Sequence, residues 1–376
     1  MRSMPFNRFS MTEQVVERGL LQEQPFVLID VGASGGIHSK WHVFGNCLRA
    51  YAFEPLLEEC TRLNNDGARN IEYLPYFVGG SAGRPKTMLD PGESFRNPDT
   101  PLGRSSALRA EKILRQTSIE RINRGKELRF SDQWISLDRF VKERGFGAAD
   151  IDFIKIDTDG SDYEVLEGST ELLQQSAVLG IALEVNFQPV PEAESITFAE
   201  IDAFCRKRGF SLFDLRPYRY SRGTLPSLFS YDFPAQSIQG QVVWGDALYL
   251  RDQCVMDSKN HPGKLSKAKL VKLACVYELH DLPDCAAELI ETHRNEFDEW
   301  TDNHTDELLD ALTPYLNGNA CSFREYNELF EKRMSLFYHG ELDLAQSRKD
   351  LQYVYSSKSW KLTKPLRQLR RILSGK

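Results

Sequence analysis

Long apolar runs, clustered cysteines and zinc-ligand spacings are missing from this sequence, and each absence excludes a class of protein. No apolar stretch reaches the roughly 18 residues that a membrane-spanning helix requires. The N-terminus has no basic patch followed by a hydrophobic stretch, so no secretory signal is expected. The seven cysteines are scattered without a Cys-x-x-Cys pair, and the seven histidines lack a His-Glu-x-x-His spacing. We therefore expect reduced thiols and a cytoplasmic location, without a disulfide framework or a metal site.

Acidic residues outnumber basic ones outside residues 356–376. The chain of 376 residues has a net charge of −7, which gives no reason to expect a nucleic-acid partner. The last segment holds seven basic residues and no acidic one, so the rest of the chain carries −14. In this segment Leu366, Leu369 and Leu373 share one helical face and the arginines lie toward the other, which is typical of an interfacial helix on an anionic membrane. Docking of the tail on the acidic body is the alternative.

Short apolar runs alternate with helical segments over the first 250 residues. The runs cover residues 26–30, 48–53, 71–78, 151–157, 178–184, 210–215 and 242–250. Continuous apolar runs are typical of buried parallel strands, so the alternation predicts an α/β doubly wound sheet. Beyond about residue 252 we expect helices at 264–280, 283–292, 305–316, 322–336 and 341–355. The sequence thus predicts an α/β domain (1–252), a helical domain (253–355) and a basic amphipathic tail (356–376).

A glycine-rich turn follows the first predicted strand. The strand ends at Asp30, and Gly32, Gly35 and Gly36 follow within six residues. Glycines let the backbone turn sharply and approach a ligand closely, and Glu54 at the end of the second run is placed to accept the hydroxyls of a ribose. The spacing is not Gly-x-Gly-x-x-Gly, which favours a nucleoside without a pyrophosphate over a dinucleotide. A purely structural turn is the alternative.

Several motifs together resemble the FkbM family of class I methyltransferases, which use S-adenosylmethionine. In order, they are Asp-Val-Gly-Ala-Ser-Gly-Gly at 30–36, Ala-Phe-Glu-Pro at 52–55, Ser-Leu-Asp at 136–138, Asp-Phe-Ile-Lys-Ile-Asp-Thr-Asp-Gly at 152–160, Val-Leu-Glu-Gly at 165–168 and Ile-Ala-Leu-Glu at 181–184. The resemblance covers roughly residues 25–250. One departure is Asp159, where the family usually has Glu.

The resemblance implies a Rossmann-like sheet, mostly parallel with a final antiparallel strand, and methyl transfer from S-adenosylmethionine to a hydroxyl oxygen. It also implies roles for individual residues. Glu54, followed by Pro55, would hold the ribose, and the loop from Asp30 to Gly36 would surround the methionine end. The cofactor-binding residues expected are Asp30, Gly32, Ala33, Ser34, Gly36, Glu54, Pro55, Val78 and Gly79, the last two flanking the adenine.

Acidic residues follow the fourth and fifth predicted strands, where ligands bind in open α/β sheets. A carboxylate here can take the proton from an acceptor hydroxyl. Asp157 is the first candidate for this general base and Asp159 the second, with Glu184 also in the catalytic set. Alternatively, Asp157 caps the following helix and Asp159 complements its dipole. A divalent metal bound by Asp157, Glu184 and Asn186 is a further, less favoured alternative.

Arginines are concentrated in residues 81–131, which we interpret as an insertion that acts as an acceptor lid. They are Arg84, Arg96, Arg104, Arg109, Arg115, Arg121, Arg124 and Arg129. Arginine suits bidentate binding of phosphates and carboxylates, as in a nucleotide-sugar or an acidic sugar. A merely solvated loop is an equal alternative.

The segment 359–367 resembles an ending found in bacterial surface-polysaccharide enzymes. The leading interpretation is therefore a sugar O-methyltransferase of surface-polysaccharide assembly, whose tail contacts the inner face of the membrane or an assembly partner. The alternatives are a non-catalytic scaffold on a methyltransferase fold, a metal-dependent O-methyltransferase of a small natural product, and a nucleotide-sugar dehydrogenase, which the glycine spacing disfavours.

Overall fold

The computed structural model describes residues 9–80, 129–147, 150–158, 161–174, 177–188, 196–220, 237–254, 265–316 and 319–356. The chain divides into two compact units, Asn7–Leu312 and a unit made of Met1–Phe6 with Thr313–Lys376. Each unit is described by itself. The helices up to residue 312 thus belong to the same compact unit as the sheet, and the predicted three-part domain division stays a prediction.

Within the described ranges, seven strands form one sheet in the order β3-β2-β1-β6-β7-β9-β8. Their bounds are Phe26–Val31 (β1), Leu48–Phe53 (β2), Ile71–Leu74 (β3), Phe153–Ile156 (β6), Gly180–Asn186 (β7), Ser211–Tyr220 (β8) and Gln241–Leu250 (β9). β9 is antiparallel to both of its neighbours, and the remaining pairs are parallel. The predicted Rossmann-like sheet, mostly parallel with a final antiparallel strand, is confirmed.

The third predicted run is two strands and not one. β3 ends at Leu74, directly before Pro75, and Phe77–Val78 (β4) pairs in parallel with Trp134–Ile135 (β5) as a separate ribbon. Proline lacks a backbone N–H and fixes φ, so it interrupts the hydrogen-bond ladder. The stacked rings of Phe77 and Trp134, with centroids 4.4 Å apart, hold the ribbon together. The ribbon brings the chain after residue 128 back beside the end of β3.

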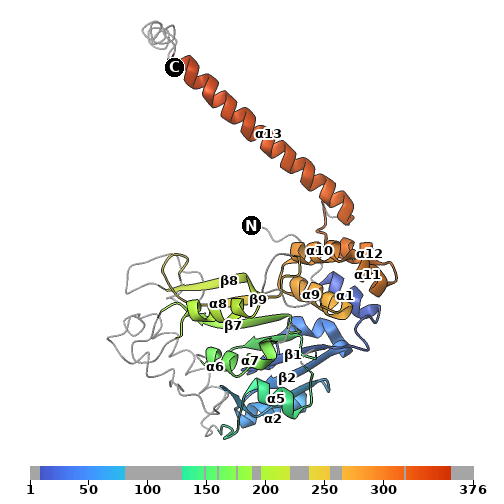
Figure 1. Cartoon of the computed structure of the whole chain (residues 1–376), viewed down its shortest axis with the longest axis vertical. Coiled ribbons are helices and arrows are strands. Elements are labelled where there is room, and N and C mark those ends of the chain that lie inside the picture. The colour runs from blue at the N-terminus through green and yellow to red at the C-terminus, as the bar shows by residue number, and fades with distance from the viewer. Residues whose placement is uncertain are drawn as a thin grey trace. The chain divides into compact units, whose positions relative to one another are not determined.

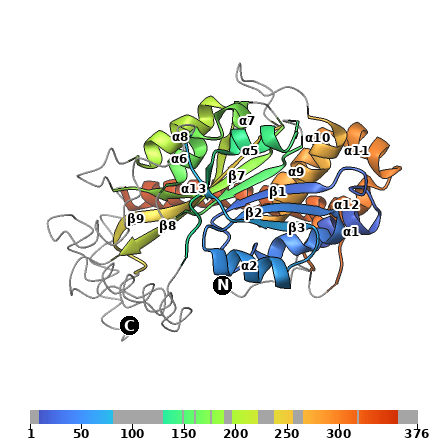
Figure 2. The ribbon, with the colours of Figure 1, turned by 90° about the horizontal axis from the view of Figure 1, so that it is seen from below.

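Helices cover both faces of the sheet (Figure 2). On one face lie α5 (Leu137–Glu143), α6 (Asp162–Glu167), α7 (Thr170–Gln174) and α8 (Phe198–Lys207), and on the other lie the 3-10 helix η1 (Ser39–Cys47) and α2 (Leu57–Asp66). Successive strand residues point to opposite faces. Ile29 of β1 therefore joins the core beneath α5–α8, whereas Phe26 stacks on Trp41 and Phe44 of η1 at 5.4 and 4.5 Å.

A group of helices packs together at one side of the sheet (Figure 1). It comprises α1 (Ser10–Glu17), α9 (Lys267–Leu279), α10 (Pro283–Thr292), α11 (Arg294–Thr301) and α12 (Thr305–Leu312). The carboxylate of Glu278 joins α9 to α1, because it accepts the amides of Met11 (2.9 Å) and Thr12 (2.7 Å). This carboxylate satisfies N–H groups in the first turn of α1 that have no partner inside the helix.

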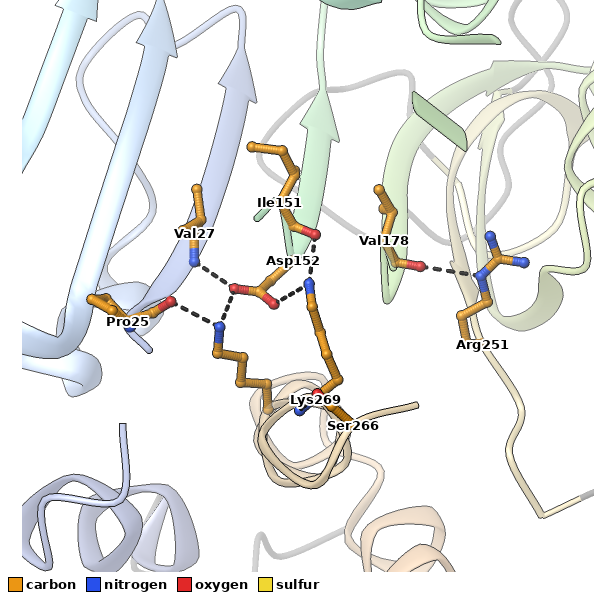
Figure 3. Close-up of polar contacts among 9 residues, drawn as sticks. Pro25, Val27, Ile151, Asp152, Val178, Arg251, Ser266 and Lys269 are labelled. Carbon is orange, nitrogen blue, oxygen red and sulfur yellow. Dashed lines mark hydrogen bonds and ion pairs between the residues drawn. The ribbon is translucent and has the colours of Figure 1, made fainter. Parts of the chain in front are cut away.

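A buried cluster of one carboxylate and two ammonium groups fastens α9 to the amino ends of β1 and β6 (Figure 3). Asp152 precedes β6 and is fully buried; it receives Lys269 Nζ at 2.6 Å and Lys272 Nζ at 2.8 Å. It also accepts the amide of Val27 at 2.7 Å. The lysines donate further to the carbonyls of Ile151 and Pro25, both at 2.8 Å. Every charge in the cluster is thus matched by an opposite charge or a hydrogen bond.

Arg251, directly after β9, is a second buried polar anchor. Its guanidinium donates to the carbonyl of Val178 at 3.1 Å (Figure 3) and to those of Arg208 and Leu173. Burial lowers the pKa of Arg251 to about 10. The side chain therefore ties the end of the sheet to the segments that lead out of α7 and α8.

The second unit contains one long helix, α13 (Phe323–Ser356), shown in Figure 1. The prediction of two helices at 322–336 and 341–355 is wrong. Gly340 lies between the two predicted helices, but a single interior glycine costs a helix only about 1 kcal/mol and the segment has no proline. No helix in the described part of the chain is both long and apolar enough to cross a membrane.

Candidate active site

The predicted glycine turn lies at the carboxyl end of β1 and is held against β2 and β6. The amides of Gly32 and Ala33 both donate to the carbonyl of Phe53, at 3.1 and 3.0 Å. Gly32 has a φ of +79°, and a Cβ on it would lie 1.8 Å from the carbonyl oxygen of Asp157. Only glycine fits there, because any side chain would push the turn away from β6.

Gly35 and Gly36 complete the turn with positive φ as well, +81° and +94°. A Cβ on Gly35 would meet nothing within 4 Å, whereas one on Gly36 would press on the hydroxyl of Tyr73. Ser34 and Gly35 are exposed and Ala33 is buried. The outer part of the turn is thus exposed at Ser34, with the amide of Gly35 donating to Glu59 Oε1 at 3.0 Å, while its base is packed.

Lys155 joins the two predicted functional carboxylates of this region. Its Nζ lies 3.1 Å from Asp30 Oδ1 and 3.3 Å from Asp157 Oδ2, and it donates to the carbonyl of Gly32 at 3.0 Å. Burial acts to lower the pKa of Lys155, but the two carboxylates outweigh it and the pKa is raised. The lysine therefore stays charged and fixes the turn against β6.

Asp30 is the most strongly perturbed carboxylate of the turn. Its side chain is almost wholly buried, and burial raises the pKa of Asp30 to about 6, even though Lys155 acts in the opposite direction. Apart from the ammonium of Lys155 at 3.1 Å, no donor within the described residues reaches the buried Oδ1 of Asp30. A cationic ligand group at this point would supply one.

Glu54 stands at the carboxyl end of β2, as predicted, and is 5% exposed. Its Oε1 accepts the amide of Leu56 at 2.8 Å, and burial raises the pKa of Glu54 above its usual range. Over the described residues Oε2 has no hydrogen-bond partner. One oxygen is thus used to orient the carboxylate and the other is available to a ligand hydroxyl, which fits the predicted ribose contact.

The other predicted cofactor residues flank Glu54 and the β4–β5 ribbon. Pro55 is half-buried and its carbonyl accepts the amide of Ser131 at 2.8 Å. Val78 and Gly79 are buried, and the amide of Gly79 donates to the carbonyl of Ile135 at 3.1 Å. The predicted insertion therefore leaves and re-enters the fold beside the carboxyl ends of β2 and β4, while residues 81–128 lie outside the described residues. The adenine contact stays a prediction.

The Ser-Leu-Asp motif has a structural use. The carboxylate of Asp138 accepts the amides of Glu171 (3.0 Å) and Leu172 (2.8 Å), which begin α7. Its own amide donates to the carbonyl of Gly168 at 2.9 Å, and a Cβ on Gly168 would lie 2.1 Å from the carbonyl oxygen of Gly79. The motif thus locks α5 and α7 to the ribbon beside the site.

Asp157, the first candidate base, directly follows β6, and its side chain is 45% exposed. It is not the cap of the following helix, because α6 begins at Asp162 with Ser161 as its N-cap residue; that alternative is wrong. Asp159, the second candidate, lies outside the described residues. Asp157 is therefore both accessible and tethered, which suits a group that must meet an acceptor.

A row of carboxylates crosses the sheet at its carboxyl end, and we call Asp157, Glu184 and Asp246 the acidic row. Ile156 pairs with Leu183, so Asp157 lies level with Glu184, and Glu184 pairs with Asp246 across β7 and β9. Equivalent positions on paired strands share a face. Asp157 lies two residues after Lys155 and therefore on the same face, and Lys155 pairs with Asp30 of β1. Glu184 and Asp246 lie level with Asp157, so all three carboxylates lie on the face that bears Asp30 and Lys155.

Asp246 is the member of the row that sequence reasoning missed. It accepts the hydroxyl of Tyr218 at 2.9 Å, and the ring of Tyr218 stacks on Trp244 with centroids 4.1 Å apart. Although the residue is exposed, neighbouring groups partly desolvate its carboxylate and raise the pKa of Asp246; nearby Asp157 adds to the rise. The signal was local: Asp246 is the one charged residue in the otherwise uncharged run 242–250.

Lys155 is a second residue of the site that sequence reasoning missed. A lysine inside a buried strand is a signal comparable to that of Asp246 in its uncharged run. Within the described ranges, no three His, Cys, Asp or Glu side chains are placed to hold an ion, and the alternative of a metal bound by Asp157, Glu184 and Asn186 stays a prediction. All seven cysteines are free thiols.

Comparisons with known proteins agree with this geometry at the level of the family. Residues 30–212, just under half of the chain, match the family model described as the methyltransferase FkbM domain. No curated protein is similar enough to the chain to count as a relative.

Similar solved structures include a SAM-dependent methyltransferase from Aquifex aeolicus, with 13% identity, 65% of this chain and 92% of that chain covered, and a TM-score of 0.27. The magnesium protoporphyrin IX methyltransferase from Synechocystis PCC 6803 with bound SAH is 7% identical, with 64% of this chain and 83% of that chain covered and a TM-score of 0.28. An uncharacterized protein from Listeria monocytogenes serotype 4b is 9% identical, with 82% of this chain and 97% of that chain covered and a TM-score of 0.31.

Proposed function

We propose that this chain, whose residues 30–212 match the model of the methyltransferase FkbM domain, is an S-adenosylmethionine-dependent methyltransferase that methylates a hydroxyl oxygen of a sugar or glycan. The observation that carries the proposal is the acidic row at the carboxyl end of the sheet, on the same face as Asp30. A hydroxyl is a poor nucleophile until its proton is leaving, and carboxylates within reach can accept that proton.

The residues around the glycine turn fit the cofactor. Glu54 would hold the ribose through Oε2, and the exposed turn at Ser34 would receive the methionine end beside Asp30. When bound, the cofactor supplies an electrophilic methyl group on a sulfonium. The chain's own part is to hold that end of the ligand at the carboxyl edge of β1, next to Lys155 and Asp157.

Asp157 is the proposed general base. As the acceptor oxygen bonds to the methyl carbon, its proton passes to Asp157, and Lys155 at 3.3 Å keeps this carboxylate in place. Asp246 and Glu184 would accept hydrogen bonds from other hydroxyls of the same acceptor. An acceptor with several neighbouring hydroxyls, such as a sugar, therefore suits the row better than an isolated alcohol.

Two further features support a sugar acceptor. The stacked rings of Tyr218 and Trp244 lie directly beside Asp246, and aromatic faces pack well against the C–H face of a sugar ring. The C-terminal resemblance to bacterial surface-polysaccharide enzymes supports a role in that pathway. We propose on the same ground that the basic tail brings the enzyme to the inner face of the membrane, where such acceptors are assembled.

The direct test is mass spectrometry of surface glycans from cells with and without the protein. A gain of one methyl group, mapped to one hydroxyl of one sugar residue and lost in the deletion strain, is expected. Unmethylated glycans in both strains, with methyl transfer to a protein or a nucleobase instead, would contradict the acceptor class.

Purified variants test the roles of the row. Asp157→Asn should lower kcat by roughly 10²–10⁴-fold and leave cofactor affinity unchanged, because it removes a base and keeps the shape. Asp246→Asn should raise KM for the acceptor by about tenfold, the loss of one hydrogen bond to a charged group, with a smaller change in kcat. Asp214→Asn, an exposed aspartate further from the carboxyl end of β8, is the matched control. Activity that is lost in EDTA and restored by Mg²⁺ would instead make Asp157 a metal ligand.

A further inference from the structure

Helix α13 carries a seven-residue repeat of large apolar side chains. Every seventh residue from its first position is Phe or Leu: Phe323, Phe330, Phe337, Leu344 and Leu351. Taking these as heptad position a, position d holds Tyr326, Arg333, Gly340, Ser347 and Val354, so the apolar repeat is carried by position a, with Leu329 and Leu336 beside it at position g. An apolar residue at every seventh position keeps one stripe facing a partner helix over five heptads, and polar residues inside such a seam cost the pair stability.

The side chains of this seam are exposed in the single chain. Phe330 and Phe337 expose 55% and 60% of their surface, and Leu344 and Leu351 expose 54% and 51%. Further apolar residues flank the seam, among them Leu329 at 46% exposed. A soluble helix that leaves such a stripe in water normally has a partner for it.

We propose that α13 pairs with α13 of a second copy of this chain as a parallel coiled coil. A helix of this length spans about 50 Å. Seam side chains that each bury on the order of 100 Å², on both copies, remove roughly 1,500 Å² from water, which is the size of a standard stable interface. The pair is independent of the chemistry of the active site.

Charge and size at the flanking positions favour the parallel, in-register alignment. In a parallel pair, position g of one helix meets position e five residues later in the other. Asp343 then faces Arg348 of the second copy, and Leu329 faces Met334. The same alignment sets the two copies of Arg333 level with each other at position d, and their long side chains must turn out to water to avoid each other. The parallel pair also sends both basic tails, residues 357–376, from the same end.

Two observations argue against a membrane as the partner of α13. Its six acidic and five basic residues nearly cancel, whereas an interfacial helix on an anionic surface is rich in Lys and Arg. Six of these eleven charged residues lie at the outer heptad positions b, c and f, where a coiled coil exposes them to water, and four lie at the flanking positions e and g, where it can pair them.

Sedimentation velocity of the full-length chain from about 1 to 100 µM tests the proposal, since this range brackets typical coiled-coil affinities. The wild type should be dimeric. Phe337→Asp places an unpaired charge in the seam and should raise the dissociation constant at least about 100-fold. The matched control is the neighbour Tyr338→Asp, at outer position b and 61% exposed against 60% for Phe337, which should change it by less than about twofold.

A charge exchange tests the partner and the direction together. Asp343→Arg and Arg348→Asp should each weaken self-association by roughly 3–10-fold, and mixing the two variants should give mainly heterodimers, because both cross-helix pairs are then restored. Unchanged thermal unfolding of the Asn7–Leu312 unit confirms that each variant is folded. A monomeric wild type at 100 µM, or a dimer that Phe337→Asp leaves intact, would overturn the proposal. So would a wild-type monomer whose binding to anionic vesicles is lost in Phe337→Asp.

Discussion

Binding of the cofactor product should weaken as the pH falls through 6, because Asp30 then becomes protonated. In the free protein, burial raises the pKa of Asp30 from 3.8 to about 6. A cationic amino group from the methionine end would satisfy the buried Oδ1 and favour the ionised form. The ligand therefore binds the carboxylate better than the carboxylic acid, and bound ligand must lower this pKa.

The size of the effect follows from that pKa. At pH 7 about nine-tenths of Asp30 is ionised in the free protein, and at pH 5 about one-tenth is. If the bound state keeps Asp30 ionised down to pH 5, the affinity falls about tenfold between pH 7 and pH 5, or about 1.4 kcal/mol. The free fold changes in the opposite sense. A raised folded-state pKa means that the contribution of Asp30 to stability is full below pH 3.8 and is lost as the pH rises through 6.

Isothermal titration calorimetry with S-adenosylhomocysteine at pH 5, 6, 7 and 8 measures the effect. In Asp30→Asn the affinity should be lower and nearly flat over this range, since no proton is exchanged at that position. Glu54→Gln separates the second buried carboxylate, whose pKa is also raised, and should keep the Asp30-dependent slope. A wild-type affinity that is the same at pH 5 and pH 7, or a slope that survives in Asp30→Asn, would refute the reasoning.

Three further predictions follow from the same contacts. Glu54→Ala removes the acceptor for the ribose hydroxyls and should weaken S-adenosylhomocysteine binding by about 1.5–3 kcal/mol; unchanged affinity in calorimetry would defeat this assignment. Asp152→Asn leaves two buried lysines short of a counter-charge and should lower the free energy of unfolding in urea by about 3–5 kcal/mol. Asp66→Asn, on an exposed ion pair, should change it by less than about 1 kcal/mol, and equal effects would contradict a buried ionic anchor. Deleting residues 356–376 should leave cofactor binding intact and abolish co-sedimentation with anionic vesicles; a wild type that ignores such vesicles at low salt would disprove the membrane contact.

The sheet and the cofactor edge could be read from sequence because both depend on local patterns. A continuous apolar run marks a buried strand wherever it occurs, so each predicted run contains a strand, and the residues that end the runs, such as Asp30 and Glu54, fall at the carboxyl edge. The errors were also local in cause. Pro75 ends β3 early, and Gly340 does not break α13.

The missed parts depend on partners that the sequence does not place side by side. Lys155 gains its meaning from the pairing of β1 with β6, which sets it beside Asp30. Asp246 joins the acidic row only because β9 inserts between β7 and β8 and runs antiparallel to both. Asp152 meets two lysines that lie 117 and 120 residues further along the chain. Strand order and register, not residue type, create these sites.

The two polar clusters of the sheet lie at opposite ends of one short strand, and this placement explains how the active edge is held. β6 has Asp152 directly before it and Lys155 within it, with Asp157 directly after it. At the amino end, fully buried charges fix β6 and β1 to α9, where no water competes for them. At the carboxyl end, the pair of Lys155 with Asp157 is partly exposed and can be reached by an acceptor. Because four residues of strand separate the two clusters, a shift of β6 at its buried end would move Asp157 by the same amount. The helices that follow residue 252 are therefore expected to matter for turnover through Asp152, although they contribute no side chain to the acidic row.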